Sequence, residues 1–187
     1  TVMAFMFRDC TKLTQLNVSS WNTSLVEKMN YVFNDCPEIT ELDLSMFDTS
    51  NVTSMGSMFT NCSKLKSVDL SSFNTSKNTS TYHMFFECNS LESIDLSNFD
   101  TSNVTSMNGM FTKCNALKEL DLSNFNTSKV TTMLNMFQYC TSLTKLNISG
   151  FDTSNVTNMN SIFSYNNKLA YIDMRNMTFG SNLLYAN

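Results

Sequence analysis

Apolar residues recur along this chain with a fixed step of 26 positions. Seven phenylalanines keep the step from Phe7 to Phe163 without an insertion or a deletion. A second aromatic column holds Trp21, Phe47, Phe73, Phe99, Phe125 and Phe151, and six cysteines form a third at Cys10, Cys36, Cys62, Cys88, Cys114 and Cys140. Constant spacing of this kind predicts a solenoid, in which each turn of chain stacks on the one before it.

Each turn contains one short segment with the alternation of a strand. In the second turn the pattern is Ile39-x-x-Leu42-x-Leu44, so Leu42 and Leu44 point to one side and Asp43 points to the other. Stacked copies of this segment predict short parallel strands along one face of the solenoid.

The rest of each turn predicts a helical flank. The run 48–51 reads Asp-Thr-Ser-Asn, and these are turn and helix-cap residues whose side chains accept hydrogen bonds from free N–H groups. Apolar residues then follow at steps of three or four: Val52, Met55, Phe59 and Cys62. This spacing is typical of a helical face about two to three turns long. Because Val, Thr, Ser and Asn are poor helix formers, an irregular or 3₁₀-like segment is the alternative.

One turn cannot fold by itself. It offers about eight large apolar side chains worth roughly 1.5–3 kcal/mol each, against a backbone-ordering cost on the order of 1–2 kcal/mol per residue. We therefore expect one α/β repeat-solenoid domain over 1–187, with short parallel strands on one face and short helices or irregular turns on the other. It would have seven 26-residue turns, with repeats from about 6 to 174 and a C-terminal cap over 175–187. The N-terminus shows no cap, which suggests an excised fragment.

The third turn departs from the pattern. Where the adjacent turns carry valine it has Asn78, and where they carry methionine it has Thr81. The only histidine, His83, lies close by in the sequence. We predict a looser flank in this turn.

The repeated motif resembles a known family. Its strand pattern, L-x-x-L-x-L, is that of leucine-rich repeats. The longer string LDLSNFDTSNVTSM followed by MFxxC is nearly intact over 94–114, with Ile94 in place of the first leucine. The chain closely resembles BspA-like leucine-rich-repeat surface proteins, also described as a lipoprotein-associated repeat of mycoplasmas and other microbes. The resemblance covers residues 6–174 and implies a bacterial or protist cell-surface protein linked to adhesion, with no catalytic residues to transfer.

Charge and composition narrow the function further. The net charge is −4, which argues against a nucleic-acid binder, because such a protein needs a basic stripe to meet phosphates. The sequence has no apolar run long enough to predict a membrane-spanning helix. Four glycines and one proline are few for a sandwich or barrel with many tight turns. No phosphate loop, nucleophile–base pair or paired histidine ligands occur. We expect no enzyme activity, no cofactor and no metal.

The cysteine column predicts a ladder of small buried thiols, since the cysteines are isolated and neighboured by Phe and Leu. Disulfides between adjacent turns and metal binding are the alternatives, because stacked positions lie roughly 5 Å apart.

The best candidate for binding is a row of outward carboxylates on the strands: Asp43, Asp69, Asp95, Asp121 and Asp173. Neighbouring charges roughly 5 Å apart repel by about 0.8 kcal/mol even in water. Hydrogen bonds to neighbouring turns plus solvent screening would offset this repulsion. The functional alternative is a cation or a basic ligand on the concave face.

Two threonine columns follow the same step. One runs from Thr23 to Thr153 and the other from Thr53 to Thr157. Turn hydrogen bonding explains them, and an ice-binding surface is the alternative.

Together these features predict an extracellular or cell-surface, non-enzymatic scaffold that binds a protein or glycan. The alternative is a filament or surface layer that self-associates through the ends of the repeat array. An ice-binding protein is the weaker third possibility.

Overall fold

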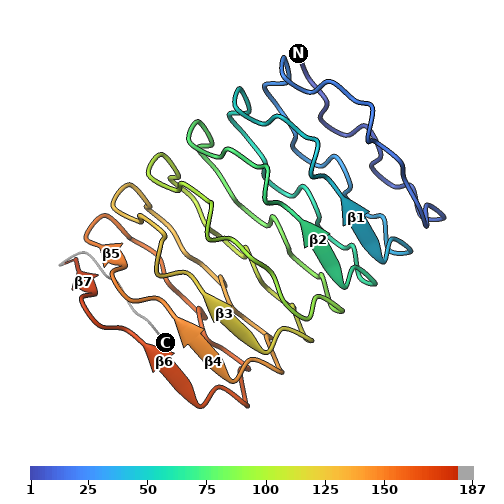
Figure 1. Ribbon diagram of the computed structural model, residues 1–187. Coiled ribbons are helices and arrows are strands. Elements are labelled where there is room, and N and C mark those ends of the chain that lie inside the picture. Colours follow the sequence, from blue (N-terminus) through green and yellow to red (C-terminus); the bar gives the residue numbers. More distant parts are fainter. Residues whose placement is uncertain (181–187) are drawn as a thin grey trace.

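The computed structural model describes residues 1–180 of the 187-residue chain as one stack of turns (Figure 1). Backbone N–H groups of one turn donate to carbonyls of the next along the stack. Phe33 N to Met58 O, at 2.9 Å, is one such bond, and Phe137 N to Ile162 O, at 3.0 Å, is another. The predicted repeat solenoid with parallel strands is therefore confirmed.

One face of the stack carries short strands. They are β1 (Glu41–Asp43), β2 (Ser67–Asp69), β3 (Glu119–Asp121), β4 (Lys145–Asn147) and β6 (Tyr171–Asp173). Every pairing is parallel, and paired residues lie 26 positions apart, as Leu42 and Val68 do. The middle residue of a strand faces the core: Leu42 is buried, whereas Glu41 and Asp43 on either side are exposed.

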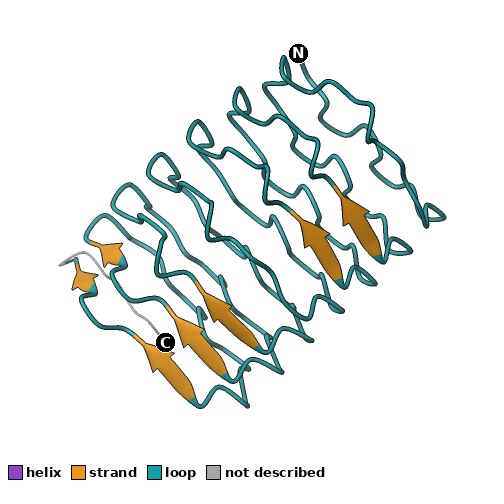
Figure 2. Cartoon of the chain, in the orientation of Figure 1, coloured by secondary structure: helices purple, strands orange, loops and turns teal. Residues whose placement is uncertain are grey.

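The strand ladder is interrupted in the middle of the stack. β1 pairs with β2, while β3, β4 and β6 form a separate three-stranded sheet. The turn between them, residues 84–109, is fully described and contains no strand. Figure 2 shows this turn as a stretch of loop between the two groups of strands.

The predicted helical flank does not form. Residues 1–180 contain no helix, and the segment 56–61 consists of consecutive turns. Alternate N–H groups bond locally, as Thr60 N does to Ser57 O, whereas the groups between them donate to the next turn, as Phe59 N does to Met84 O at 3.0 Å. A helix needs every N–H to bond within the segment. Stacking removes about half of those bonds, so the spacing of three and four reflects successive turns.

Left-handed backbone at two positions per turn also excludes a helix. Ser57 and Asn61 have φ values of 57° and 59°. The equivalent positions behave alike: one column is Phe5, Tyr31, Ser57, His83, Gly109, Asn135 and Ser161, and the other is Asp9, Asp35, Asn61, Glu87, Lys113, Tyr139 and Tyr165. For most L-residues this conformation costs roughly 1–2 kcal/mol. Only one of these positions is glycine, the residue that usually marks left-handed backbone. The amino-acid composition therefore did not indicate that these turns would form.

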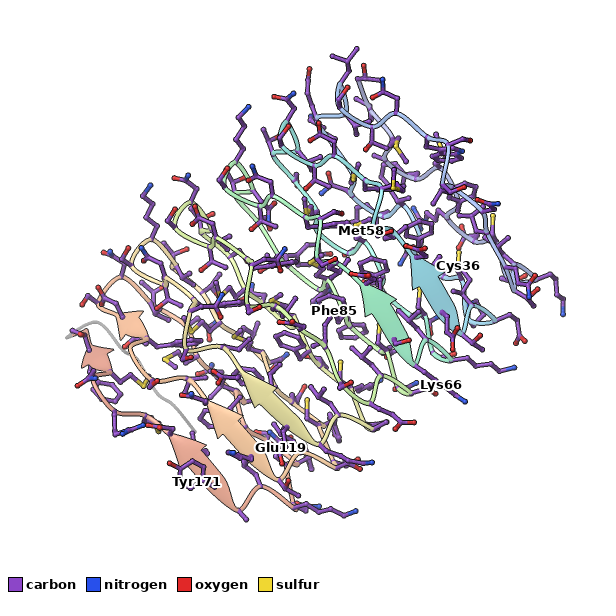
Figure 3. All side chains as sticks on the ribbon, in the orientation of Figure 1. Cys36, Met58, Lys66, Phe85, Glu119 and Tyr171 are labelled. Atoms are coloured by element: carbon purple, nitrogen blue, oxygen red, sulfur yellow. The ribbon has the colours of Figure 1, made fainter. Side chains whose placement is uncertain are left out.

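Two ladders fill the interior. The phenylalanine rings from Phe7 to Phe163 stack with centroid separations of 5.5–5.9 Å. Buried thiols donate to carbonyl groups of the phenylalanine column, as Cys62 Sγ does to Phe33 O at 3.1 Å. Figure 3 shows Cys36, Met58 and Phe85 within the stack. Buried residues from Met3 to Ile162 form one core cluster.

The third turn places polar groups in this core. Asn78 and Thr81 are both 0% exposed, and Nδ2 of Asn78 has no hydrogen-bond partner within the described part of the chain. Single β-bridges join the flanks of other successive turns, but among residues 1–180 none joins Ser54 to Ser80. The sequence irregularity thus coincides with a missing bridge and an unpaired amide, and the looseness of this flank stays a prediction.

Near the C-terminal end, β5 (Asp152–Thr153) pairs with β7 (Thr178–Phe179) in a further two-stranded parallel sheet. This pairing brings the first part of the expected cap against the preceding turn. The rest of that cap, residues 181–187, lies outside the described residues.

Candidate ligand-binding face

The predicted aspartate row lies on the strand face. Its members end successive strands, or the equivalent stretch where no strand forms: Asp43 in β1, Asp69 in β2, Asp95, Asp121 in β3 and Asp173 in β6. The pairing register sets Asp43 opposite Asp69 and Asp121 opposite Asn147 of β4. The side chains therefore follow one another along the stack.

Each aspartate closes its own turn. The N–H group two residues later donates to its Oδ1, as Ser71 N does to Asp69 and Ser97 N to Asp95, both at 2.9 Å. The same bond forms at Asp43, Asp121 and Asp173. Short Asp and Asn side chains favour this turn. The main partner of each carboxylate therefore lies in its own turn, whereas the sequence predicts partners in neighbouring turns.

These bonds also decide the electrostatics of the row. The hydroxyl and N–H of Ser71 lower the pKa of Asp69 below its ordinary value, and the charge of Asp43 opposes them with a smaller effect. For Asp95 the N–H of Ser97 is the largest cause of a lowered pKa. Local hydrogen bonding thus outweighs repulsion along the row, so the carboxylates stay ionised at neutral pH.

Asp173 differs from the rest because a cation pairs with it. Arg175 Nη2 donates to Asp173 Oδ2 at 2.6 Å, and Arg175 Nε donates to Oδ1 at 3.0 Å. Asp173 is buried, whereas the other four aspartates are exposed. Since both oxygens of Asp173 are engaged, the part of the row open to solvent is Asp43, Asp69, Asp95 and Asp121.

Among residues 1–180, surface depressions lie at three places on the strand face. One of about 370 Å³ lies beside Glu41 and Asp43. A second, of about 150 Å³, adjoins Asp69 and Asp95 where the strand ladder is interrupted. The third, of about 360 Å³, lies over β3, β4 and β6. Each contains at least one member of the aspartate row, so fixed polar groups and concave surface coincide on this face.

Sequence reasoning missed two residues of the third depression. Lys145 and Tyr171 line it. They occupy an outward column that earlier turns fill with Gln15, Glu41, Ser67, Ser93 and Glu119. The change from polar or acidic residues to a basic and then an aromatic one is visible only when this column is aligned by itself.

The cysteine column is structural. All six cysteines are free, and five of them are buried. Burial raises the pKa of the Cys36 thiol to about 11 and that of Cys140 to about 12. Because the thiolate is the reactive form, these groups are poor nucleophiles and poor metal ligands at neutral pH.

The threonine hydroxyls are used within the fold. In the first column, Thr49 is buried, and its Oγ1 donates to Asn74 O at 2.9 Å while accepting from Asn74 N at 2.8 Å. In the second column the hydroxyls donate to carbonyls one turn earlier, as Thr105 Oγ1 does to Thr79 O. The first column bridges turns in the interior and therefore cannot meet ice, while the second is exposed.

The single histidine, possible metal ligands and possible membrane-spanning helices were the remaining candidates for function. Burial lowers the pKa of His83, whose ring packs between Tyr82 and Phe86 at centroid separations of 4.3 and 4.6 Å. Within residues 1–180, no three His, Cys, Asp or Glu residues are placed to hold a metal ion together. The same residues include no helix that could span a bilayer.

A solved structure shares this fold, and two others show weaker similarity. A leucine-rich-repeat protein of T. pallidum has a TM-score of 0.58 and 21% identity, over 87% of this chain and 70% of that one. A leucine-rich-repeat protein from Bacteroides ovatus gives 0.47 and 20%, covering 86% and 43% of the two chains. A leucine-rich cell-surface protein from Faecalibacterium prausnitzii gives 0.32 and 16%, covering 91% and 68%. The T. pallidum structure confirms the leucine-rich-repeat fold that the sequence resemblance implied.

The chain also matches a family model. The family is described as Mycoplasma protein of unknown function, DUF285, and its model aligns with residues 1–117 and again with 79–183. No curated protein matches the chain.

Proposed function

This chain belongs to the DUF285 family, and we propose that it is a non-enzymatic, cell-surface scaffold that binds a protein or glycan partner through its strand face. The observation that carries the proposal is the coincidence of the open aspartate row with the three depressions on that face. Oδ1 of each aspartate is fixed by a backbone N–H, so little side-chain freedom is lost when a partner binds.

The charge of the face favours a basic protein segment as one partner. Asp43, Asp69 and Asp95 are exposed, and local hydrogen bonds keep their pKa values low. A row of fixed negative charge attracts a basic segment and speeds its association. An extracellular or cell-surface location is part of the same proposal, because the repeated motif resembles that of BspA-like surface proteins.

The test uses an oligolysine peptide and two matched double variants. Asp69→Asn with Asp95→Asn removes two charges from the strand face. The control variant, Asp100→Asn with Asp152→Asn, also removes two negative charges. These two aspartates accept the same kind of hydrogen bond but lie at a different corner of the turn. Asparagine preserves the fold at both places, because Asn147 and Asn126 already accept this bond in their own turns.

We expect the strand-face pair to weaken peptide binding about three- to tenfold at moderate salt and the control pair to change it less than about twofold. Biolayer interferometry measures both, and raising the salt concentration should weaken wild-type binding. Equal losses in the two pairs would mean that net charge alone attracts the peptide, and the strand face would lose its assigned role.

Self-association through the array end is a second candidate. In the first turn, Val2, Phe5 and Met6 are 61%, 50% and 49% exposed. Two copies that pair through these side chains would cover this apolar surface.

Sedimentation velocity over a wide concentration range tests this candidate. We expect assembly that Phe5→Lys with Met6→Lys abolishes and that Met46→Lys, at an exposed methionine of the second turn, preserves. A wild-type chain that remains monomeric at the highest concentration would exclude end-to-end assembly.

A further inference from the structure

We infer that the depression over β3, β4 and β6 is a carbohydrate-binding groove that receives one pyranose unit of a glycan. The inference rests on the proposed function, because the groove lies on the same strand face. Its volume of about 360 Å³ falls at the lower end of the roughly 300–1,000 Å³ typical of small-ligand sites. One sugar ring therefore suits it better than an extended peptide.

Tyr171 supplies the apolar surface of the groove. It opens β6 and is 52% exposed, and in the two turns before it the outward position holds Lys145 and Glu119. Figure 3 shows Glu119 and Tyr171 on the strand face. The face of an aromatic ring carries partial negative charge and attracts the C–H groups on the flat side of a sugar. The phenolic hydroxyl lies near Asp173, where it helps to lower the pKa of that carboxyl, after the larger effect of Arg175.

Fixed polar groups adjoin the ring. Asp121 Oδ1 accepts from Ser123 N at 2.9 Å, and Asn147 Oδ1 accepts from Ser149 N at 3.0 Å. These bonds hold both side chains in place, and the register pairs Asp121 with Asn147 across β3 and β4. After the N–H and hydroxyl of Ser123, the side chain of Asn147 also helps to lower the pKa of Asp121, so the two polar groups lie close together. An adjacent acceptor and donor match neighbouring sugar hydroxyls, each of which can donate and accept.

The charge of the groove favours a polyhydroxy ligand over a cationic one. Lys145 Nζ lies 3.8 Å from Glu119 Oε2, and Arg175 pairs with Asp173. Two of the three carboxylates that line the groove therefore have a cation partner, in contrast to the unpaired row at Asp69 and Asp95. A basic segment would therefore bind at the row of unpaired carboxylates. The groove instead offers hydrogen-bond donors and acceptors whose charges are mostly balanced by a partner of opposite sign.

A glycan microarray probed with the full chain tests the inference, with three variants beside the wild type. Tyr171→Ala removes the ring, Tyr171→Phe keeps it, and Tyr165→Ala removes a similarly exposed tyrosine that stacks on Tyr139 away from the groove. We expect the wild type to bind at least one class of glycan. Tyr171→Ala should weaken that binding about tenfold or more, and the other two variants should preserve it within about threefold.

Salt dependence gives a second readout. Raising the salt concentration should weaken the binding of oligolysine but change the binding of an uncharged glycan little. Absence of glycan binding by a folded wild-type chain overturns the groove, as does binding that Tyr171→Ala leaves intact. Either result could occur while oligolysine still binds through Asp69 and Asp95, so failure of the groove is distinguishable from failure of the proposed function.

Discussion

At the scale of single residues, the threonine, cysteine and aspartate columns of the repeat act mainly through hydrogen bonds to the backbone. Thr49 bridges to the next turn, Cys62 donates to the preceding one, and Asp69 closes its own turn. The burial of the thiols was predictable from their apolar neighbours. The role of the aspartates was not, since alternation shows only that a side chain points outward and leaves its partner undefined.

The third turn supplies a residue-scale prediction. Asn78→Val should raise the free energy of unfolding by about 1–3 kcal/mol, because it removes a buried amide with an unpaired Nδ2 and restores apolar volume. Valine fits this column, since Val52 and Val104 are fully buried at the equivalent positions. Urea denaturation measures the change.

The reciprocal variant is the control. Val104→Asn should destabilise the chain by about 2–4 kcal/mol, because it buries an amide where the surroundings are apolar. If Asn78→Val destabilised the chain to a similar extent, the bond that Asn78 Oδ1 accepts from Ser80 N at 3.4 Å would outweigh the cost of the unpaired Nδ2.

At the scale of elements, the alternation of apolar and polar residues predicted the strands correctly, whereas the apolar spacing of three and four predicted a helix that does not form. Leu42 and Leu44 are buried on either side of Asp43, as the pattern required. The flank shows the apolar spacing of a helix, yet it is built from turns with left-handed residues such as Ser57 and Asn61. Spacing within one turn cannot reveal this, because the carbonyls that replace the helical partners belong to the next turn.

The aspartate-closed turns make stability depend on pH. Hydrogen bonds from the serine two residues later lower the pKa of Asp69 and Asp95 on the strand face and of Asp48 and Asp152 at the next corner. In the unfolded chain these groups titrate near pH 4. The unfolded state therefore binds more protons below that pH, and folding stability falls as the pH drops through the lowered native pKa values.

We expect a melting temperature that varies little from pH 7 to about pH 5 and then declines progressively below about pH 4. Circular dichroism melts over this range measure it, with Asp69→Asn and Asp95→Asn together as the comparison. In that variant the melting temperature should fall less at low pH, because two of the titrating carboxylates are absent. A melting temperature unchanged down to pH 2 would show that the hydrogen bonds do not favour the ionised carboxylates.

At the scale of the whole molecule, stacking distributes stability among neighbours. Each turn contacts mainly the turns beside it, so an array of this kind can weaken locally without losing its fold. The missing bridge between Ser54 and Ser80 and the interruption between β2 and β3 both fall near the middle of the stack. Constant spacing predicted the solenoid, but these interruptions depend on how each pair of turns fits together.

The binding face was predictable only in part. The aspartate row followed from alternation and repeat length. The groove required the stacking order, because its ring comes from β6 and its paired amide and carboxylate from β4 and β3. Residues that lie far apart in the sequence became neighbours through a register that no single turn specifies.

The most direct test of the central claim, that partners bind the strand face, is an amide NMR titration of the full chain with oligolysine. The amides of Ser71 and Ser97 report on the strand face because they donate to Asp69 and Asp95. Those of Ser102 and Ser154 donate to Asp100 and Asp152 and serve as internal controls. The strand-face pair should shift in proportion to bound peptide while the control pair stays fixed. Shifts confined to Ser102 and Ser154, or equal in all four amides, would contradict the claim.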